Sequence, residues 1–303
     1  MKTYICLTKE AAKLNTFTIK DIENLTGIKA HTLRIWEQRY NLLLPRRKET
    51  NHRIYDNDAL KALLRVAQLY HSGMKISRIA AMTPEEIRNA TLEHLEGEHL
   101  YTSYVSQLIE CSIEFDQPRF ERIFHSILLH MGFEKCITKV IYPFLHRIGL
   151  LWVTGNVIPS QEHFASTIIR SKLIVATDGL NVSIASDDHY LTFLPEGELH
   201  EIPLLYVNYL LKKNGKQVTN LGPDVPLDDV TCFARYKKPS HVLTYMMTHV
   251  SKPDMHAYIS LVKELGQQTK MLVMGPAVGH LAHVEGITVI KTAAELEAYA
   301  AIQ

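Results

Sequence analysis

Cysteine is scarce in this sequence, and its few copies stand far apart. The chain of 303 residues has four cysteines, and no two of them form a CxxC pair. They are Cys6, Cys111, Cys136 and Cys232. This scatter argues against a zinc ribbon and a disulfide framework, and it predicts a reducing compartment, the cytoplasm.

Long apolar runs are also missing. No stretch approaches the roughly 20 apolar residues that cross a bilayer. Residues 1–7 have no long apolar run with a small-residue cleavage site, so no signal peptide is predicted. No P-loop, GxGxxG or Ser-His-Asp arrangement stands out, so we predict no catalytic residues and no enzyme. The length predicts two or three domains of ordinary globular composition.

The chain has almost no net charge, but its positive charge is concentrated in one region. The formal net charge is +1, yet residues 17–80 hold twelve Lys and Arg against six Asp and Glu. Such asymmetry is expected when one domain meets phosphates and the rest of the chain does not. A solvated basic face has the same count, so charge alone leaves both interpretations open.

Residues 15–85 have the order of elements of a winged helix-turn-helix. A capping-box pattern at Thr18 predicts a short helix that ends at Gly27. A second helix is predicted from about residue 29 to 40, and Asp56 caps a third helix beyond a basic hairpin. The apolar residues at helical spacing in the second helix are Leu33, Trp36 and Tyr40.

The runs TLRIWEQRY (32–40), LPRR (44–47) and NHRIY (51–55) carry a more specific signal. They resemble the MerR family of bacterial regulators, whose motif T-L-R-x-[WY]-E-x-R-Y precedes a P-x-R wing. The Trp-Glu-x-Arg-Tyr version resembles the subgroup with cobalamin-binding sensors. The resemblance implies a dimer or tetramer on double-stranded operator DNA, with no membrane partner.

The side chains that we predict to contact DNA are basic or polar and lie in the second helix and the wing. They are His31, Arg34, Arg39, Arg46, Arg47, His52, Arg53 and Tyr55. Two alternatives stay open. In the first, Arg34 and Arg39 only pair with Glu37, and the segment is a helical domain of another kind. In the second, which concerns Tyr55 alone, this side chain belongs to the core instead of contacting a phosphate.

The remaining chain predicts two further domains. Residues 96–180 hold four helical runs with short connections, which indicates an antiparallel four-helix bundle. In residues 187–303, apolar strands alternate with amphipathic helices, which indicates a doubly wound, flavodoxin-like parallel sheet. The expected strands are 190–194, 218–221, 242–246, 271–274 and 287–290.

Trp152, Glu162 and His163 have the spacing W-x9-E-H. Alone, these residues suit a core tryptophan and an ordinary helix start. In a bundle that precedes a doubly wound domain, they resemble the cap of the cobalamin-dependent photoreceptor repressors of the MerR class. The resemblance implies that Trp152 covers the upper ligand of the cofactor. Those photoreceptors carry a histidine beside the tryptophan. Here that residue is Val153, so a bis-histidine light-adapted state is not expected.

Glu198-Leu199-His200 follows the first predicted strand and resembles the E/D-x-H motif of cobalamin-binding domains. The resemblance implies that His200 ligates cobalt, that Glu198 orients its ring, and that Thr244 and Gly275 line the path of the nucleotide tail. It implies adenosyl- or methylcobalamin as the cofactor.

Two prolines depart from that pattern. Pro203 stands where the lower-ligand motif ends in glycine, and Pro276 replaces the second of two paired glycines. Proline adds a ring and removes a donor, which narrows or closes the tail's route. Three interpretations remain: a cobalamin-responsive regulator, a regulator whose sensor is only a scaffold for dimerisation or protein interaction, and a cobalamin carrier subunit of an enzyme.

Overall fold

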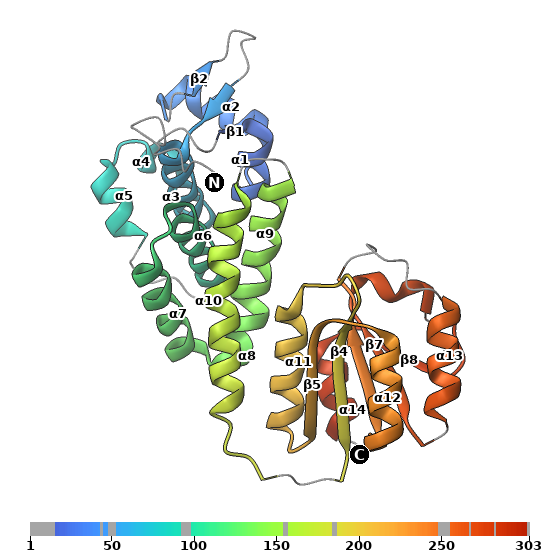
Figure 1. Ribbon diagram of the computed structural model, residues 1–303. Coiled ribbons are helices and arrows are strands. Elements are labelled where there is room, and N and C mark those ends of the chain that lie inside the picture. Colours follow the sequence, from blue (N-terminus) through green and yellow to red (C-terminus); the bar gives the residue numbers. More distant parts are fainter. Residues whose placement is uncertain are drawn as a thin grey trace, which may run out of the picture. The chain divides into compact units, whose positions relative to one another are not determined.

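A computed structural model describes most of the chain, in nine segments (Figure 1). These are residues 16–42, 45–47, 53–91, 98–153, 157–183, 187–247, 255–266, 268–281 and 283–301. The chain divides into two compact units, Met1–Thr167 and Ile168–Gln303. Within the described segments, no helix has the length and apolar character needed to cross a bilayer.

The first unit begins with a small winged module of helices and an antiparallel sheet. Its helices are α1 (Ile19–Thr26), α2 (Ala30–Tyr40), α3 (Asn57–His71), α4 (Ile76–Ile79) and α5 (Pro84–Ala90). Its strands are β1 (Phe17–Thr18), β2 (Arg46–Arg47) and β3 (Arg53–Tyr55), in the order β1-β3-β2. The predicted helix-turn-helix and its wing are therefore confirmed as local structure.

The ends of these helices follow from local chemistry. Thr18 and Asp21 form the predicted capping box, in which each side chain bonds the backbone N–H of the other residue. Gly27 ends α1 in the left-handed region at φ 72°, where glycine has no steric penalty. The carboxylate of Asp56 accepts a bond from Ala59 N and so caps α3, as its position predicts.

The four predicted helical runs follow. They are α6 (Glu98–Glu114), α7 (Gln117–Met131), the run of α8 (Phe133–Lys135), η2 (Cys136–Ile141) and α9 (Tyr142–Val153), and α10 (Pro159–Asp178). The third run contains a π-helical segment, η2, that the sequence pattern does not reveal.

Helix α3 of the winged module is tied to the bundle by a buried carboxylate. Glu110 on α6 is 2% exposed and binds Arg65 Nη2 of α3 at 2.8 Å and Arg119 Nη2 of α7 at 3.0 Å. A buried carboxylate is tolerated when it is paired in this way. The predicted division into domains 15–85, 96–180 and 187–303 stays a prediction, because the compact units number two.

The second unit contains the predicted doubly wound sheet. Its elements in order are β4 (His189–Pro195), α11 (Glu201–Lys213), β5 (Gln217–Val225), α12 (Leu227–Lys237), β6 (His241–Tyr245), α13 (Met255–Leu265), β7 (Lys270–Met274), η3 (Pro276–Leu281), β8 (Ile287–Ile290) and α14 (Ala293–Ala301). All five strands are parallel, in the order β5-β4-β6-β7-β8. This is the flavodoxin-like order, whose switch point lies between β4 and β6.

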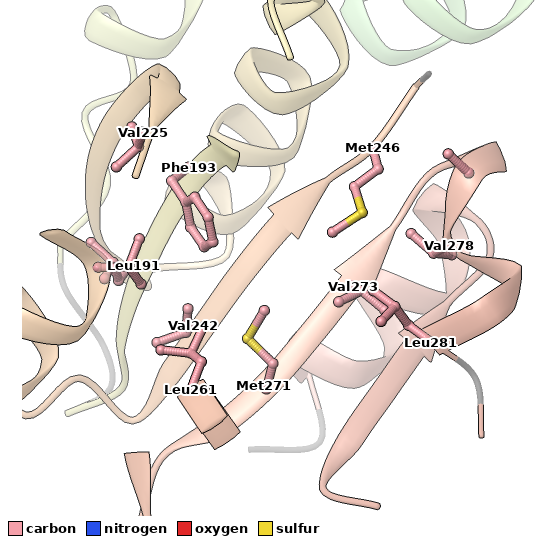
Figure 2. Close-up of a cluster of buried hydrophobic side chains, with 12 residues drawn as sticks. Leu191, Phe193, Val225, Val242, Met246, Leu261, Met271, Val273, Val278 and Leu281 are labelled. Carbon is pink, nitrogen blue, oxygen red and sulfur yellow. The ribbon is translucent and has the colours of Figure 1, made fainter. Parts of the chain in front are cut away.

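One face of this sheet carries a continuous apolar core, drawn in Figure 2. Leu191, Val242 and Met271 are paired in register on three neighbouring strands, so their side chains share that face. Val230 of α12 and Leu261 of α13 close the cluster from outside. The three inner strands β4, β6 and β7 are buried on both faces, which explains why their sequences are almost continuously apolar.

Candidate functional site

The outer face of α2 is polar and positively charged. His31, Arg34 and Arg39 are exposed, whereas Leu33 and Trp36 are buried on the opposite side of the helix. Tyr70 of α3 packs edge-on against Trp36 with ring centroids 4.8 Å apart, which fixes the helix against the module. An anchored helix with an exposed basic face is what a major-groove reader requires.

Glu37 is the residue that joins this helix to the wing. Its Oε2 accepts a hydrogen bond from Arg53 Nε at 2.7 Å, and its Oε1 accepts one from the hydroxyl of Tyr55. The Glu37 side chain is 9% exposed and that of Arg53 is 22% exposed. The partner of Glu37 is therefore Arg53 of β3, rather than Arg34 or Arg39 as the alternative interpretation had it.

Tyr55 belongs to the core of the module. It is 3% exposed, and burial, together with its bond to the Glu37 carboxylate, raises the pKa of its hydroxyl. The alternative interpretation, in which Tyr55 is a core residue, is therefore confirmed. Contacts of Tyr55 and Arg53 with DNA stay predictions, and both residues have a structural partner already.

The other wing residues are less fully described. Arg46 and Arg47 lie on β2, where they pair in register with Ile54 and Arg53, and the structure describes only their backbone. His52 lies outside the described residues. Their predicted contacts with phosphates therefore stay predictions.

Trp152, Glu162 and His163 lie in the first unit, at the end of α9 and the start of α10. Trp152 is 51% exposed, which is unusual for so large an apolar side chain. Glu162 accepts a hydrogen bond from the hydroxyl of Ser166, and its Oε2 lies 3.0 Å from His163 Nδ1. The carboxylate of Glu162 is thus held by two neighbours on its own helix, whereas about half of the Trp152 side chain is exposed.

His200 lies in the second unit, in the loop that follows the inner strand β4. Its Nδ1 is 2.5 Å from Oε1 of Glu198, which also accepts a bond from His200 N at 3.0 Å. Glu198 is 4% exposed, whereas the His200 side chain is 54% exposed. A buried carboxylate that holds Nδ1 fixes the ring and leaves Nε2 as the nitrogen for a metal.

The neighbouring strands hold this loop in place. Glu198 Oε2 accepts a bond from Met247 N at 2.9 Å, just beyond β6. Gly197 N donates to Asp224 Oδ1 at 2.8 Å on β5. The loop is therefore fixed from both sides at the carboxyl edge of the sheet, where open α/β sheets bind ligands.

Thr244 and Gly275 have contrasting surroundings. Thr244 is fully buried on β6, and its hydroxyl has no hydrogen-bond partner in the described part of the chain. At Gly275, φ is 106° and an added Cβ would lie 2.2 Å from Met246 O. Glycine is thus required there by the chain's own backbone.

Both unexpected prolines occupy positions that tolerate them. Pro203 lies in the first turn of α11, and Pro276 is the first residue of the 3₁₀ helix η3. A residue in the first turn has no intrahelical acceptor for its N–H, so proline loses no bond there. Sequence reasoning missed the linking roles of Glu37 and Met247, because their partners are distant in sequence.

Comparisons with known proteins match two separate parts of this chain. A family model described as MerR HTH family regulatory protein matches residues 17–86, and one described as B12 binding domain matches residues 104–176. The monomethylamine corrinoid protein of Methanosarcina barkeri superposes with a TM-score of 0.54 at 19% identity, over 64% of this chain and 95% of that protein. At such a low sequence identity, this structural similarity is evidence for the fold only and not for a shared function.

Two curated relatives are transcriptional repressors of Myxococcus xanthus. The HTH-type transcriptional repressor CarA is 32% identical over 213 residues, which are 70% of this chain and 69% of CarA. The HTH-type transcriptional repressor CarH is 28% identical over 228 residues, which are 71% of this chain and 73% of CarH. The chain therefore belongs to the MerR family of DNA-binding transcriptional regulators, and it carries in addition a segment that matches a B12-binding domain.

Proposed function

We propose that this regulator senses cobalamin in its C-terminal half and that occupancy changes its assembly and its affinity for operator DNA. The observation that carries the proposal is His200, whose Nδ1 is held by the buried Glu198 carboxylate. Bound cobalamin would supply a cobalt ion that can accept one imidazole nitrogen as a ligand, and His200 would provide it. In neutral His200, Nδ1 carries the proton toward Glu198, so Nε2 has the lone pair that such a metal needs.

Features of the two units, each taken by itself, support the binding of this cofactor. In the second unit, the hydroxyl of Thr244 is buried and has no hydrogen-bond partner among the described residues. Such a hydroxyl has a free-energy cost that a bound ligand can remove. In the first unit, the half-exposed ring of Trp152, with Glu162 and His163 beside it, is an apolar surface on which a ligand can pack. We propose the adenosyl or methyl form, because each has a carbon-bonded organic group that can pack on an aromatic ring, whereas hydroxide or cyanide on the cobalt does not.

The proposal places operator contacts on the winged module. His31, Arg34 and Arg39 contribute from α2, and Arg46, Arg47, His52 and Arg53 from the wing. MerR-type modules read pseudo-palindromic sites, so we propose a dimer or tetramer as the DNA-bound form. We also propose a cytoplasmic regulator rather than an enzyme subunit, because a cobalamin carrier has no need for operator contacts.

A second candidate function is a regulator whose sensor half only mediates dimerisation or protein interaction. The close approach of Met246 to Gly275 supports it, because backbone already occupies the space beside that glycine. Pro276, which follows directly, removes one donor from the same route. Under this candidate the protein binds operator DNA and binds no cobalamin.

The deciding experiment reconstitutes the full-length protein with adenosylcobalamin in the dark and records its absorption spectrum after gel filtration. We expect a coloured, stoichiometric complex whose visible bands differ from those of the free cofactor. His200→Ala should abolish that difference in the bands. The matched control is His283→Ala, because His283 is an exposed histidine of the same unit outside the proposed site.

Operator binding is then measured with and without the cofactor, and each protein's oligomeric state is measured in parallel. A change in both on cofactor addition supports the sensor. A colourless wild-type protein that still binds operator DNA refutes cobalamin sensing and favours the second candidate. A coloured His200→Ala protein with unchanged bands refutes the assigned cobalt ligand.

A further inference from the structure

One face of α2 carries two uncharged side chains among its basic ones. His31, Arg34, Ile35 and Gln38 follow one another at i, i+3, i+4 and i+7, so they form one stripe along the helix. All four are exposed. Leu33 and Trp36 on the other side carry the packing against the module, so this stripe has no core function.

Ile35 is unusual in this stripe. It is 50% exposed, although it is branched, apolar and surrounded by polar neighbours. The other large apolar side chain that is exposed in the described part of the winged module is Tyr70, whose ring packs on Trp36. No described residue covers Ile35 in this way, and half of its side chain is exposed, so its alkyl group is available to a partner that docks on α2.

Duplex DNA offers a matching group in the major groove. The C5-methyl of thymine is the one apolar group on the base edges there, and apolar side chains pack against it. The amide of glutamine matches adenine, because it donates to N7 and accepts from N6 at the same time. Ile35 and Gln38 therefore present the two chemistries that distinguish A·T pairs from G·C pairs.

The spacing along the helix fits neighbouring base pairs. Three residues of α-helix rise about 4.5 Å, and consecutive base pairs are about 3.4 Å apart along one strand. Side chains at positions 35 and 38 therefore reach the same or the next pair. Arg34 and Arg39 lie beside them, and contacts of either arginine with phosphates add affinity without sequence preference.

We propose that Ile35 and Gln38 set the sequence preference of this regulator. Ile35 packs on a thymine methyl group, and Gln38 bonds the N6/N7 edge of an adenine at the same or an adjacent pair of each half-site. The inference deepens the proposed operator contacts of α2 and rests on them. It is independent of cobalamin.

The test begins with selection of bound duplexes from a random pool by the full-length protein. In the enriched site, each thymine is then replaced by deoxyuridine, which lacks the methyl group, and each adenine by 7-deazaadenine, which lacks N7. Loss of the contacted methyl should weaken wild-type binding about 4-fold per half-site. Loss of the contacted N7 should weaken it roughly 5-fold or more.

The variants Ile35→Ala and Gln38→Ala should each lose sensitivity to one replacement only. Ile35→Ala should bind thymine and deoxyuridine equally and still require adenine N7, and Gln38→Ala should do the reverse. Leu129→Ala is the matched control, because Leu129 is 88% exposed on α7, outside the winged module. It should keep both sensitivities. Circular dichroism verifies the fold of each variant.

The outcomes separate the two levels of the proposal. If selection enriches no sequence, the operator-reading role of α2 and this inference both fail. If a sequence is enriched but no deoxyuridine or 7-deazaadenine replacement changes wild-type affinity, only the assignment of Ile35 and Gln38 is wrong. The same holds if the variants keep both sensitivities.

Discussion

Replacing Glu37 by glutamine tests whether the wing is held to α2 by a charge. The carboxylate accepts bonds from Arg53 and Tyr55, which lie 16 and 18 residues further along the chain. Glutamine has nearly the same shape and still offers one oxygen. The substitution therefore removes the negative charge and one acceptor while it leaves the packing of the helix in place.

The expected size follows from these two bonds. Hydrogen bonds to charged groups contribute about 1.5–3 kcal/mol and neutral ones about 1 kcal/mol. Both bonds weaken at once, and the partly buried guanidinium of Arg53 loses its counter-charge. We therefore expect the free energy of unfolding of the winged module to fall by about 2 kcal/mol. That loss corresponds to a roughly 30-fold larger unfolded population of the winged module.

The assay is urea unfolding followed by tryptophan fluorescence. The chain has two tryptophans, so a Trp152→Phe background leaves Trp36 as the single reporter. Because Trp36 is buried in α2, its emission follows the winged module. Glu85→Gln is the matched control, because the Glu85–Arg88 pair is more than half exposed on both sides. Its expected effect is below about 0.5 kcal/mol.

Two results would contradict the reasoning. One is a Glu37→Gln midpoint that differs no more than that of the Glu85 control. The other is a double-mutant cycle between Glu37→Gln and Arg53→Gln with no coupling energy. A lower operator affinity of Glu37→Gln, together with an unchanged salt dependence, would support a positioning role, because Glu37 itself offers no charge to phosphates.

Four further predictions concern stability. Glu110→Gln should lower the free energy of unfolding by roughly 3 kcal/mol in denaturant titrations, because two arginines lose their buried counter-charge. Gly275→Ala should lower the free energy of unfolding by roughly 2 kcal/mol or more, seen as a lower melting temperature, because its Cβ would overlap Met246 O. Gly149→Ala should instead gain about 1 kcal/mol, since its Cβ meets nothing within 4 Å on α9. Burial lowers the pKa of His189, so the unfolded state takes up its proton first on acidification. Unfolding free energy should therefore fall as pH decreases through about 6.5, and His189→Gln should flatten that slope.

Much of this protein could be predicted from local patterns in its sequence. Helix starts such as Thr18 and Asp56, and the glycine end of α1, depend on side chains within a few residues of the backbone groups that they satisfy. The parallel sheet follows from continuous apolar strands that alternate with helices. The E-x-H motif predicts an oriented imidazole, because Glu198 and His200 are only two residues apart.

Other features required the tertiary structure, because the interacting groups are distant in sequence. Whether Glu37 pairs with Arg34, Arg39 or Arg53 depends on how β3 folds back on α2, and no spacing rule contains that information. The same is true of Glu198 and the backbone of Met247, 49 residues later. Local sequence thus determined the helices, the strands and the two motifs. Long-range packing decided which polar groups became buried next to one another. Because buried polar groups need hydrogen-bond partners, these groups pair with one another.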